Sequence, residues 1–154
     1  MEHLTFKWTN AEDPDFRRFY TITEEYYNSL VGGQQNRIGF VPYNLSESIY
    51  DVLIAYIDDL AVGCAGLKRY SDSDTEIKRV WVEPEFRGRH IASAMMDIAE
   101  EKAIQQGFMR TVLQTREIMT AAVNMYKERG YYRIENYPPY DRLKGAVCFA
   151  KDLA

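Results

Sequence analysis

The pattern that most constrains the fold lies in residues 50–107, where the hydrophobic period changes from that of strands to that of a helix. The runs YDVLIAYID and LAVGCAGLKRY predict two strands joined by a short turn at Asp58 and Asp59, which makes a hairpin. The next run, TEIKRVWVEP, does not alternate strictly, so it predicts a strand that is buried on both faces or interrupted by a bulge. Apolar residues then recur at helical spacing from Ile91 to a stop at Gly107, which predicts a long helix.

The flanking segments add strands and helices in an order that excludes a purely parallel sheet. Residues 3–9 alternate like a half-buried strand, and a helix is expected from Pro14 to the Gly32–Gly33 pair, followed by an irregular loop. After the long helix come a strand at MRTVLQT, a helix from Ile118 to Arg129 and a closing strand at GAVCFAKDL. Because a hairpin precedes this part and a lone strand closes it, the sequence predicts an α+β (mixed α/β) fold.

Length, charge and cysteine usage exclude several classes of protein. The 154 residues suffice for one core and are too few for two ordinary domains, so a single domain over residues 1–154 is expected. A net charge of -4 argues against a general nucleic-acid binder, and nothing resembles a leader or a membrane span. Cys64 and Cys148 lie in apolar runs without metal-ligand spacing, which predicts buried free thiols in a reducing cytoplasm and no metal site.

The turn EFRGRHIASA, residues 85–94, stands between the third predicted strand and the long helix. The first N–H groups of a helix lack partners within it and carry partial positive charge, so they favour an anion. Gly88 allows close approach of a ligand, and Arg87 and Arg89 add charged donors suited to phosphate oxygens. The turn therefore predicts a phosphate site, with a solvated basic patch as the plain alternative.

Two segments resemble the GNAT superfamily of acyl-CoA-dependent N-acetyltransferases. EIKRVWVEPEFRGRHIASAMM, Glu76 to Met96, is similar to its acyl-CoA signature, and AAVNMYKERGYYRI is similar to its later segment. The resemblance implies a mostly antiparallel sheet of six to seven strands with a splayed central pair and about four helices. It also implies acetyl-CoA as the co-substrate, with its pyrophosphate held by the turn from Arg87 to Ala92.

The resemblance further implies roles for individual residues. Tyr126 would protonate the leaving thiolate, although its helical stripe would also suit a core tyrosine. Glu76 would be the base, directly or through water, or else a strand-end carboxylate paired to Lys78 or Arg79 while a water chain takes the proton. A main-chain N–H, expected at Val82, would hold the oxyanion. The residues implied to contact the coenzyme are Val80, Val82, Arg87, Gly88, Arg89, His90, Ile91 and Ala92.

Two positions depart from the family pattern. His90 stands where the family has glycine, and we expect it to lie already in the first helical turn, so that its backbone needs no positive φ. Met119 stands where many relatives carry an asparagine that contacts the pantetheine arm. Neither departure changes the expected ligand.

The acceptor is the part of the reaction that the sequence specifies least. We expect a primary amine of a small molecule or peptide, acetylated directly in a ternary complex without an acyl-enzyme. The acidic composition mildly favours a cationic acceptor, and Tyr43, Tyr137 and Tyr140 could line its pocket, although packing is favoured for each. The alternative is a noncatalytic acyl-CoA sensor. A homodimer is compatible with the resemblance.

Overall fold

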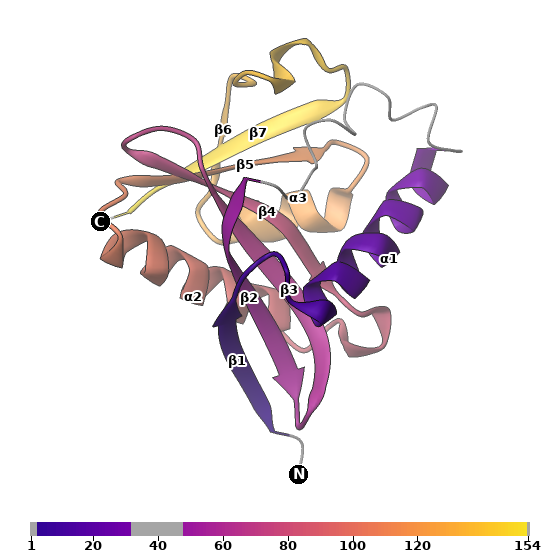
Figure 1. The fold of residues 1–154 in the computed structure, drawn as a ribbon. Coiled ribbons are helices and arrows are strands. Elements are labelled where there is room, and N and C mark those ends of the chain that lie inside the picture. Colours follow the sequence, from indigo (N-terminus) through magenta and orange to yellow (C-terminus); the bar gives the residue numbers. More distant parts are fainter. Residues whose placement is uncertain (1–2, 32–47, 154) are drawn as a thin grey trace.

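A computed structural model describes residues 3–31 and 48–153 (Figure 1). Seven strands form one sheet in the order β1-β2-β3-β4-β5-β7-β6. The strands are β1 (Leu4–Thr9), β2 (Ile49–Ile57), β3 (Leu60–Arg69), β4 (Asp74–Val82), β5 (Arg110–Arg116), β6 (Tyr132–Ile134) and β7 (Ala146–Asp152). The α-helices of the described residues are α1 (Pro14–Val31), α2 (Ile91–Gln105) and α3 (Thr120–Glu128), with 3-10 turns at Pro84–Phe86 and Tyr140–Arg142.

Strand β4 lies at the centre of the sheet and contains a bulge. Cys64 pairs with Trp81 and Gly66 pairs with Lys78, so two residues of β4 oppose one residue of β3. Arg79 is one of these two and has a left-handed φ of 58°. Both sequence interpretations of this strand are therefore confirmed, because β4 is also buried on both faces along most of its length.

The sheet opens between β4 and β5, the only parallel pair in the described sheet. Their register runs from Asp74 with Arg110 to Glu76 with Val112 and then stops, although both strands continue. Figure 1 shows the two strands diverging beyond this point. The splayed central pair is thus confirmed, and it leaves main-chain groups of β4 without a neighbouring strand on one side.

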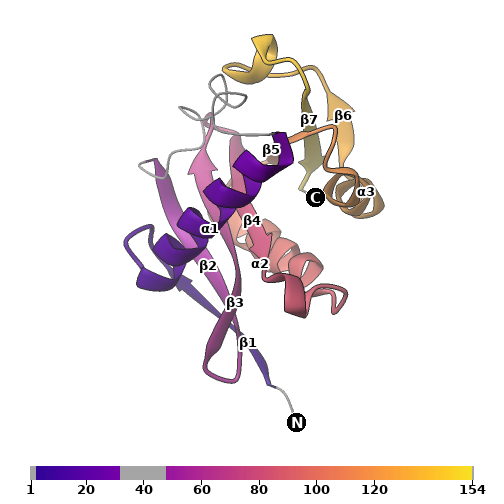
Figure 2. The ribbon, with the colours of Figure 1, turned by 90° about the vertical axis from the view of Figure 1, so that its right-hand side faces the viewer.

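Helices α1 and α2 cover opposite faces of the β2–β4 part of the sheet (Figure 2). On one face, Phe16 and Phe19 of α1 pack with Val52 and Ile54 of β2. On the other face, the apolar side of α2 packs against Leu53 and its neighbours. Alternate residues of β2 thus point to opposite helices, as the period of a strand requires.

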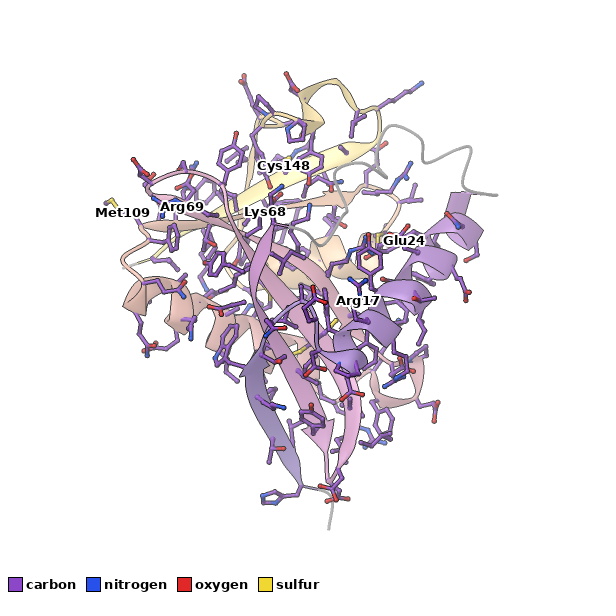
Figure 3. All side chains as sticks on the ribbon, viewed as in Figure 1. Arg17, Glu24, Lys68, Arg69, Met109 and Cys148 are labelled. Atoms are coloured by element: carbon purple, nitrogen blue, oxygen red, sulfur yellow. The ribbon has the colours of Figure 1, made fainter. Side chains whose placement is uncertain are left out.

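A charged contact fixes α1 on the bulge of β4. Glu24 projects from α1 toward the sheet (Figure 3), and its Oε1 accepts a hydrogen bond from Arg79 at 2.5 Å. Thr23 accepts a second one at 3.0 Å, and the guanidinium of Arg79 stacks on the ring of Tyr20 at 4.0 Å. The unusual backbone of Arg79 is therefore held by partners from α1.

The seven-strand α+β fold agrees with the prediction, and the differences are local. The structure has three α-helices in its described residues rather than about four, together with the two 3-10 turns. Strand β6 was missed because three residues are too short to show a period. Cys64 and Cys148 are buried free thiols, as expected. None of the described helices combines the length and the apolarity needed to span a membrane.

Candidate active site

A cleft of about 360 Å³ lies beside the end of β4, beyond the part of this strand that pairs with β5. Its walls come from the end of β4, the following turn, the first turn of α2, one face of α3 and two tyrosines of α1. Among its lining residues are Tyr26, Tyr27, Val80, Trp81, Val82, Phe86, Arg87, Gly88, His90, Ile91, Ala92, Ser93, Met119, Ala122, Met125 and Tyr126. Seven of the eight residues predicted to contact the coenzyme line this cleft. The eighth, Arg89, is exposed and lies over the ring of Phe86 at 5.1 Å.

A smaller cavity of about 100 Å³ adjoins the cleft deeper between the strands. It is lined by Tyr27, Glu76, Ile77, Lys78, Arg79, Val80, Gln114, Thr115, Arg116, Met119, Ala122 and Tyr126. Five residues line both spaces, namely Tyr27, Val80, Met119, Ala122 and Tyr126. A molecule lying in the cleft would meet a molecule in the cavity at these five residues, which we call the junction.

Tyr126 is a buried residue of the junction whose hydroxyl is free to bind a ligand. Its side chain is 7% exposed, and its ring meets that of Tyr131 edge-on at 5.8 Å. Within the described part of the chain, no residue forms a hydrogen bond with this hydroxyl. Burial raises the pKa of Tyr126, so the phenol keeps its proton at neutral pH. Because Tyr126 lines both the cleft and the small cavity, its hydroxyl is a candidate for contact with substrate.

The turn before α2 presents main-chain N–H groups to the cleft. Two residues, Gly88 and His90, have left-handed φ values of 81° and 62°. The first hydrogen bond of the helix runs from the N–H of Ala94 to the carbonyl of His90, and no described side chain caps this end. The N–H groups of Ile91, Ala92 and Ser93 therefore lack intrahelical acceptors, which is the arrangement that favours binding of an anion.

The expectation about His90 is wrong. It is not in the first helical turn but precedes the helix as its N-cap, in the left-handed conformation that glycine adopts without strain. Its side chain is exposed, so the backbone takes the glycine conformation while the imidazole extends into solvent. Histidine is among the residues that tolerate this region, which explains how the substitution is accommodated.

Substitutions at His90 should separate backbone strain from the loss of the imidazole. We expect His90→Gly to raise the free energy of unfolding by about 0.5 kcal/mol, because relief of strain exceeds the added freedom of the unfolded chain. His90→Val should lower it by about 1 to 2 kcal/mol, since a β-branched side chain fits this region poorly. Urea unfolding measures both changes, and equal stability of the two variants would contradict the assigned backbone conformation.

Arg87 is anchored at the edge of the cleft by contacts on β4 and α1. Its Nε donates to the carbonyl of Val82 at 2.9 Å, and its guanidinium lies 4.7 Å from the ring centroid of Trp81. Glu83 donates its N–H to Val62 on the β3 side. Because successive peptide groups of a strand alternate, the N–H of Val82 faces the opposite side, toward the opening.

A buried ionic cluster ties together the two helices that wall the cleft. Arg129, at the end of α3, donates to the carbonyl of Ser93 at 3.1 Å and to Asp97 at 2.6 Å, both in α2. Glu100 of α2 accepts from Arg129 at 3.2 Å, from Lys151 at 2.8 Å and from the hydroxyl of Tyr131 at 3.0 Å. Tyr131 contacts Tyr126, so this cluster also supports the junction.

Glu76 lies in the small cavity, where side chains hold it from two sides. It is 3% exposed, and its Oε2 accepts a hydrogen bond from the hydroxyl of Tyr137 at 2.7 Å. Lys78 donates to the hydroxyl of Tyr140 at 2.6 Å, and its Nζ is 3.9 Å from Oε1 of Glu76. The alternative pairing of Glu76 with Lys78 is therefore present, and Tyr137 and Tyr140 support these charges without lining either space.

Lys78 is a buried charge, so its protonation should make the unfolding free energy depend on pH. Burial lowers the pKa of Lys78 from 10.5 to about 8. Between these two values the unfolded chain binds a proton that the folded chain has lost, so this contribution to the unfolding free energy rises with pH. Burial raises the pKa of Cys64 to about 12 and that of Cys148 to about 11. The contributions of these thiols to the unfolding free energy therefore fall as pH rises, opposite to that of Lys78.

A comparison with Lys78→Met isolates the lysine, because the thiols contribute equally to both proteins. We expect the unfolding free energy of the wild type, relative to that of the variant, to rise by about 2 kcal/mol from pH 8 to pH 10. Urea unfolding across this range provides the measurement. A difference that does not change with pH would show that Lys78 titrates like an exposed lysine.

Several residues of the site were missed in the sequence. Lys78 was considered only as a partner of Glu76, although charges inside the apolar run EIKRVWV signal a buried polar site, and Arg116 was not singled out. Tyr27 and Phe86 were missed because aromatic residues at helix and turn positions usually belong to the core. Met119 lies at the junction, with the Thr115 hydroxyl 3.7 Å from its sulfur. Tyr43 lies outside the described residues.

Comparisons with known proteins agree with this architecture. Residues 6–131 match the Acetyltransferase (GNAT) family. The Probable N-acetyltransferase camello of Xenopus tropicalis is 32% identical over 89 residues, which cover 55% of this chain and 41% of that protein. The chain spans less than half the length of the curated relatives that it matches.

Solved structures share the fold at low sequence identity. An acetyltransferase of the GNAT family from Staphylococcus aureus is 14% identical with a TM-score of 0.75, covering 99% of this chain and 100% of the other. A GNAT family acetyltransferase from Elizabethkingia anophelis, solved with acetyl-CoA bound, is 18% identical with a TM-score of 0.69, covering 97% and 98%. The family match over residues 6–131 shows that this chain belongs to the acetyltransferase (GNAT) family, and the fold agrees with it.

Proposed function

We propose that the protein transfers an acetyl group from acetyl-CoA to a primary amine of a small molecule or peptide, directly and within a ternary complex. The observation that supports the proposal most is the position of Tyr126, a buried residue that lines both spaces and whose hydroxyl forms no hydrogen bond with the described residues. It lies where the larger cleft meets the smaller cavity. A proton donor at such a junction suits a reaction in which one substrate enters from each side.

The residues around the cleft fit coenzyme A. The unpaired N–H groups at the start of α2 suit a pyrophosphate, and Gly88 has no side chain to block its approach. Arg87 and Arg89 would add charge at the same end. The pantetheine arm would follow the opening along β4, where the N–H of Val82 faces away from β3. Acetyl-CoA would supply the thioester carbonyl at the junction.

The reaction requires one new bond, one broken bond and two proton movements. The amine nitrogen bonds to the carbonyl carbon and loses a proton, while the carbon–sulfur bond breaks and the thiolate gains a proton, giving an amide and the free thiol. Tyr126 would donate to the sulfur as it leaves. Because its pKa is raised, the donation begins as a hydrogen bond that stabilises developing thiolate charge.

The carbonyl oxygen needs a donor near Tyr126. The sequence favoured the N–H of Val82, but that residue lines only the cleft. Val80 lines both spaces and follows Arg79 in the bulge, where the pairing with β3 is disrupted. We therefore favour the N–H of Val80 for the oxyanion and that of Val82 for the pantetheine arm.

Glu76 is proposed to take the amine proton through a water molecule. Its Oε2 is engaged by Tyr137, and it lies further along β4 from the junction than Lys78 does, so a direct contact is less suited than a relay. A water chain that carries the proton to solvent would use the same cavity. In either case no cysteine takes part, because Cys64 and Cys148 are buried away from both spaces.

The test is release of coenzyme A from acetyl-CoA with a panel of amino acids, polyamines, amino sugars and short peptides. We expect release with at least one amine and no acetyl label on the denatured protein. Binding of acetyl-CoA without release by any amine would favour the alternative, a noncatalytic acyl-CoA sensor. Absence of both binding and release would contradict the proposal.

A further inference from the structure

We infer that the acceptor carries a carboxylate beside its amine, as a small amino acid does, and that Lys78 binds this carboxylate. The inference rests on the proposed function, because it assigns the small cavity to the acceptor. It goes beyond the proposed function by naming a class of acceptor and by making Lys78 a residue that determines specificity. Three features of the molecule support it, namely the position of Lys78, the charges around the cavity and the size of the cavity.

On the cavity side of the junction, the nearest charged residues of β4 are Arg79 and Lys78. Arg79 is already bound by residues of α1, so Lys78 is the candidate for contact with the acceptor. A strand advances about 3.3 Å per residue, so Lys78 lies roughly 7 Å along β4 from Val80, and Glu76 lies roughly 13 Å away. The acceptor nitrogen must reach the thioester at the junction. A group on the neighbouring carbon of the acceptor would then lie beside Lys78.

The charged side chains that line the small cavity favour an anion there. Among the described residues that line it, Lys78, Arg79 and Arg116 are cationic and Glu76 is a carboxylate. The nearby carboxylate of Glu24 pairs with Arg79, and Glu76 remains 3.9 Å from the ammonium of Lys78. Among these described side chains the cations outnumber the carboxylates by three to two, so the balance of charge favours an anion over a second cation.

Burial makes the charge of Lys78 costly, which an acceptor carboxylate would offset. Lys78 is 7% exposed, and burial is the main cause that lowers its pKa; the charge of Glu76 opposes this effect, whereas those of Lys68 and Arg79 add to it. A carboxylate held beside the ammonium would favour its charged form. The same ammonium would disfavour protonation of the adjacent acceptor amine, which must be neutral to attack. Local charge therefore reverses the preference for a cationic acceptor that overall composition suggested.

The size of the cavity points to a compact acceptor. Its volume of about 100 Å³ is well below the roughly 300 to 1,000 Å³ of sites that enclose drug-sized ligands. An amino sugar or a long polyamine would extend far beyond it, whereas the amine and carboxylate of a small amino acid lie on one carbon. The cavity thus suits the reacting end of an α-amino acid.

The experiment compares each small α-amino acid with its own carboxamide, using coenzyme A release to obtain kcat/KM. For the best acceptor we expect the acid to be preferred over its carboxamide by at least tenfold. The intrinsic reactivity of the amines would favour the carboxamide instead, because its amine is less basic and more often neutral. In Lys78→Met the ratio should fall to about one, while Lys144→Met, a change at an exposed lysine outside both spaces, should keep it.

The wild-type ratio tests the inference even if Lys78→Met does not fold. A ratio near one, a preference for carboxamides, or turnover of neither member of any pair would overturn it. Calorimetric titration with acetyl-CoA distinguishes failure of the carboxylate inference from failure of the proposed function. Binding together with turnover of simple amines or carboxamides would overturn only the carboxylate inference, whereas absence of binding and of all turnover would overturn the proposed function as well.

Discussion

Replacing Tyr126 with Phe is expected to lower kcat for acetyl transfer by about 10²-fold, with a small change in the KM for acetyl-CoA. A positioned proton donor contributes roughly 10²- to 10⁴-fold to such a reaction. The phenyl ring keeps the contact with Tyr131, so the walls of the junction remain in place. Steady-state release of coenzyme A with the best acceptor provides the measurement.

The stability of Tyr126→Phe separates chemistry from folding. Because no described residue bonds to the Tyr126 hydroxyl, its removal should leave the melting temperature unchanged or slightly raised. Tyr132→Phe is the matched control, since this tyrosine is 42% exposed and its hydroxyl contacts Asp152. We expect the control to keep kcat within twofold. A Tyr126→Phe enzyme of wild-type kcat would remove the hydroxyl from the mechanism.

Reversing two charges at the start of α2 should abolish tight binding of the coenzyme. The double variant Arg87→Glu, Arg89→Glu places two carboxylates where the pyrophosphate is proposed to lie. Loss of charge-assisted hydrogen bonds costs roughly 1.5 to 3 kcal/mol each, so the Kd for acetyl-CoA should rise by at least about 100-fold. Isothermal titration calorimetry measures this change directly.

A control must match the change in net charge, because overall charge alone affects association of an anion. Lys7→Glu with Arg133→Glu makes the same change at exposed positions on β1 and β6, outside both spaces. We expect its Kd for acetyl-CoA to stay within about threefold of the wild type. If both double variants weaken binding equally, the effect is one of general charge and the turn is not the phosphate site.

The fold was accessible from the sequence where periodicity extends over many residues. The hairpin of β2 and β3, the long helix α2 and the irregularity of β4 each leave a pattern in the chain. The conformation of His90 was not accessible, because one residue carries no period and its φ depends on how the turn meets the cleft. The family pattern has glycine where this chain has His90, and that glycine was the one feature that indicated a positive φ at this position.

For a similar reason, only part of the candidate site could be predicted from the sequence. The turn from Arg87 to Ala92 forms a continuous motif, so its place at the cleft followed from one segment. The small cavity instead combines side chains from α1, β4, β5 and α3, and only the sheet brings them together. Lys78 shows the difference, since its partner Tyr140 is 62 residues away in the sequence.

The most direct test of the proposed mechanism is a crystal structure of the protein with acetyl-CoA or a thioether analogue that cannot react. We expect the pyrophosphate on the N–H groups at the start of α2 and the sulfur within about 3.5 Å of the Tyr126 hydroxyl, with the acyl end facing the small cavity. A coenzyme bound elsewhere, or one whose sulfur lies far from Tyr126, would contradict it.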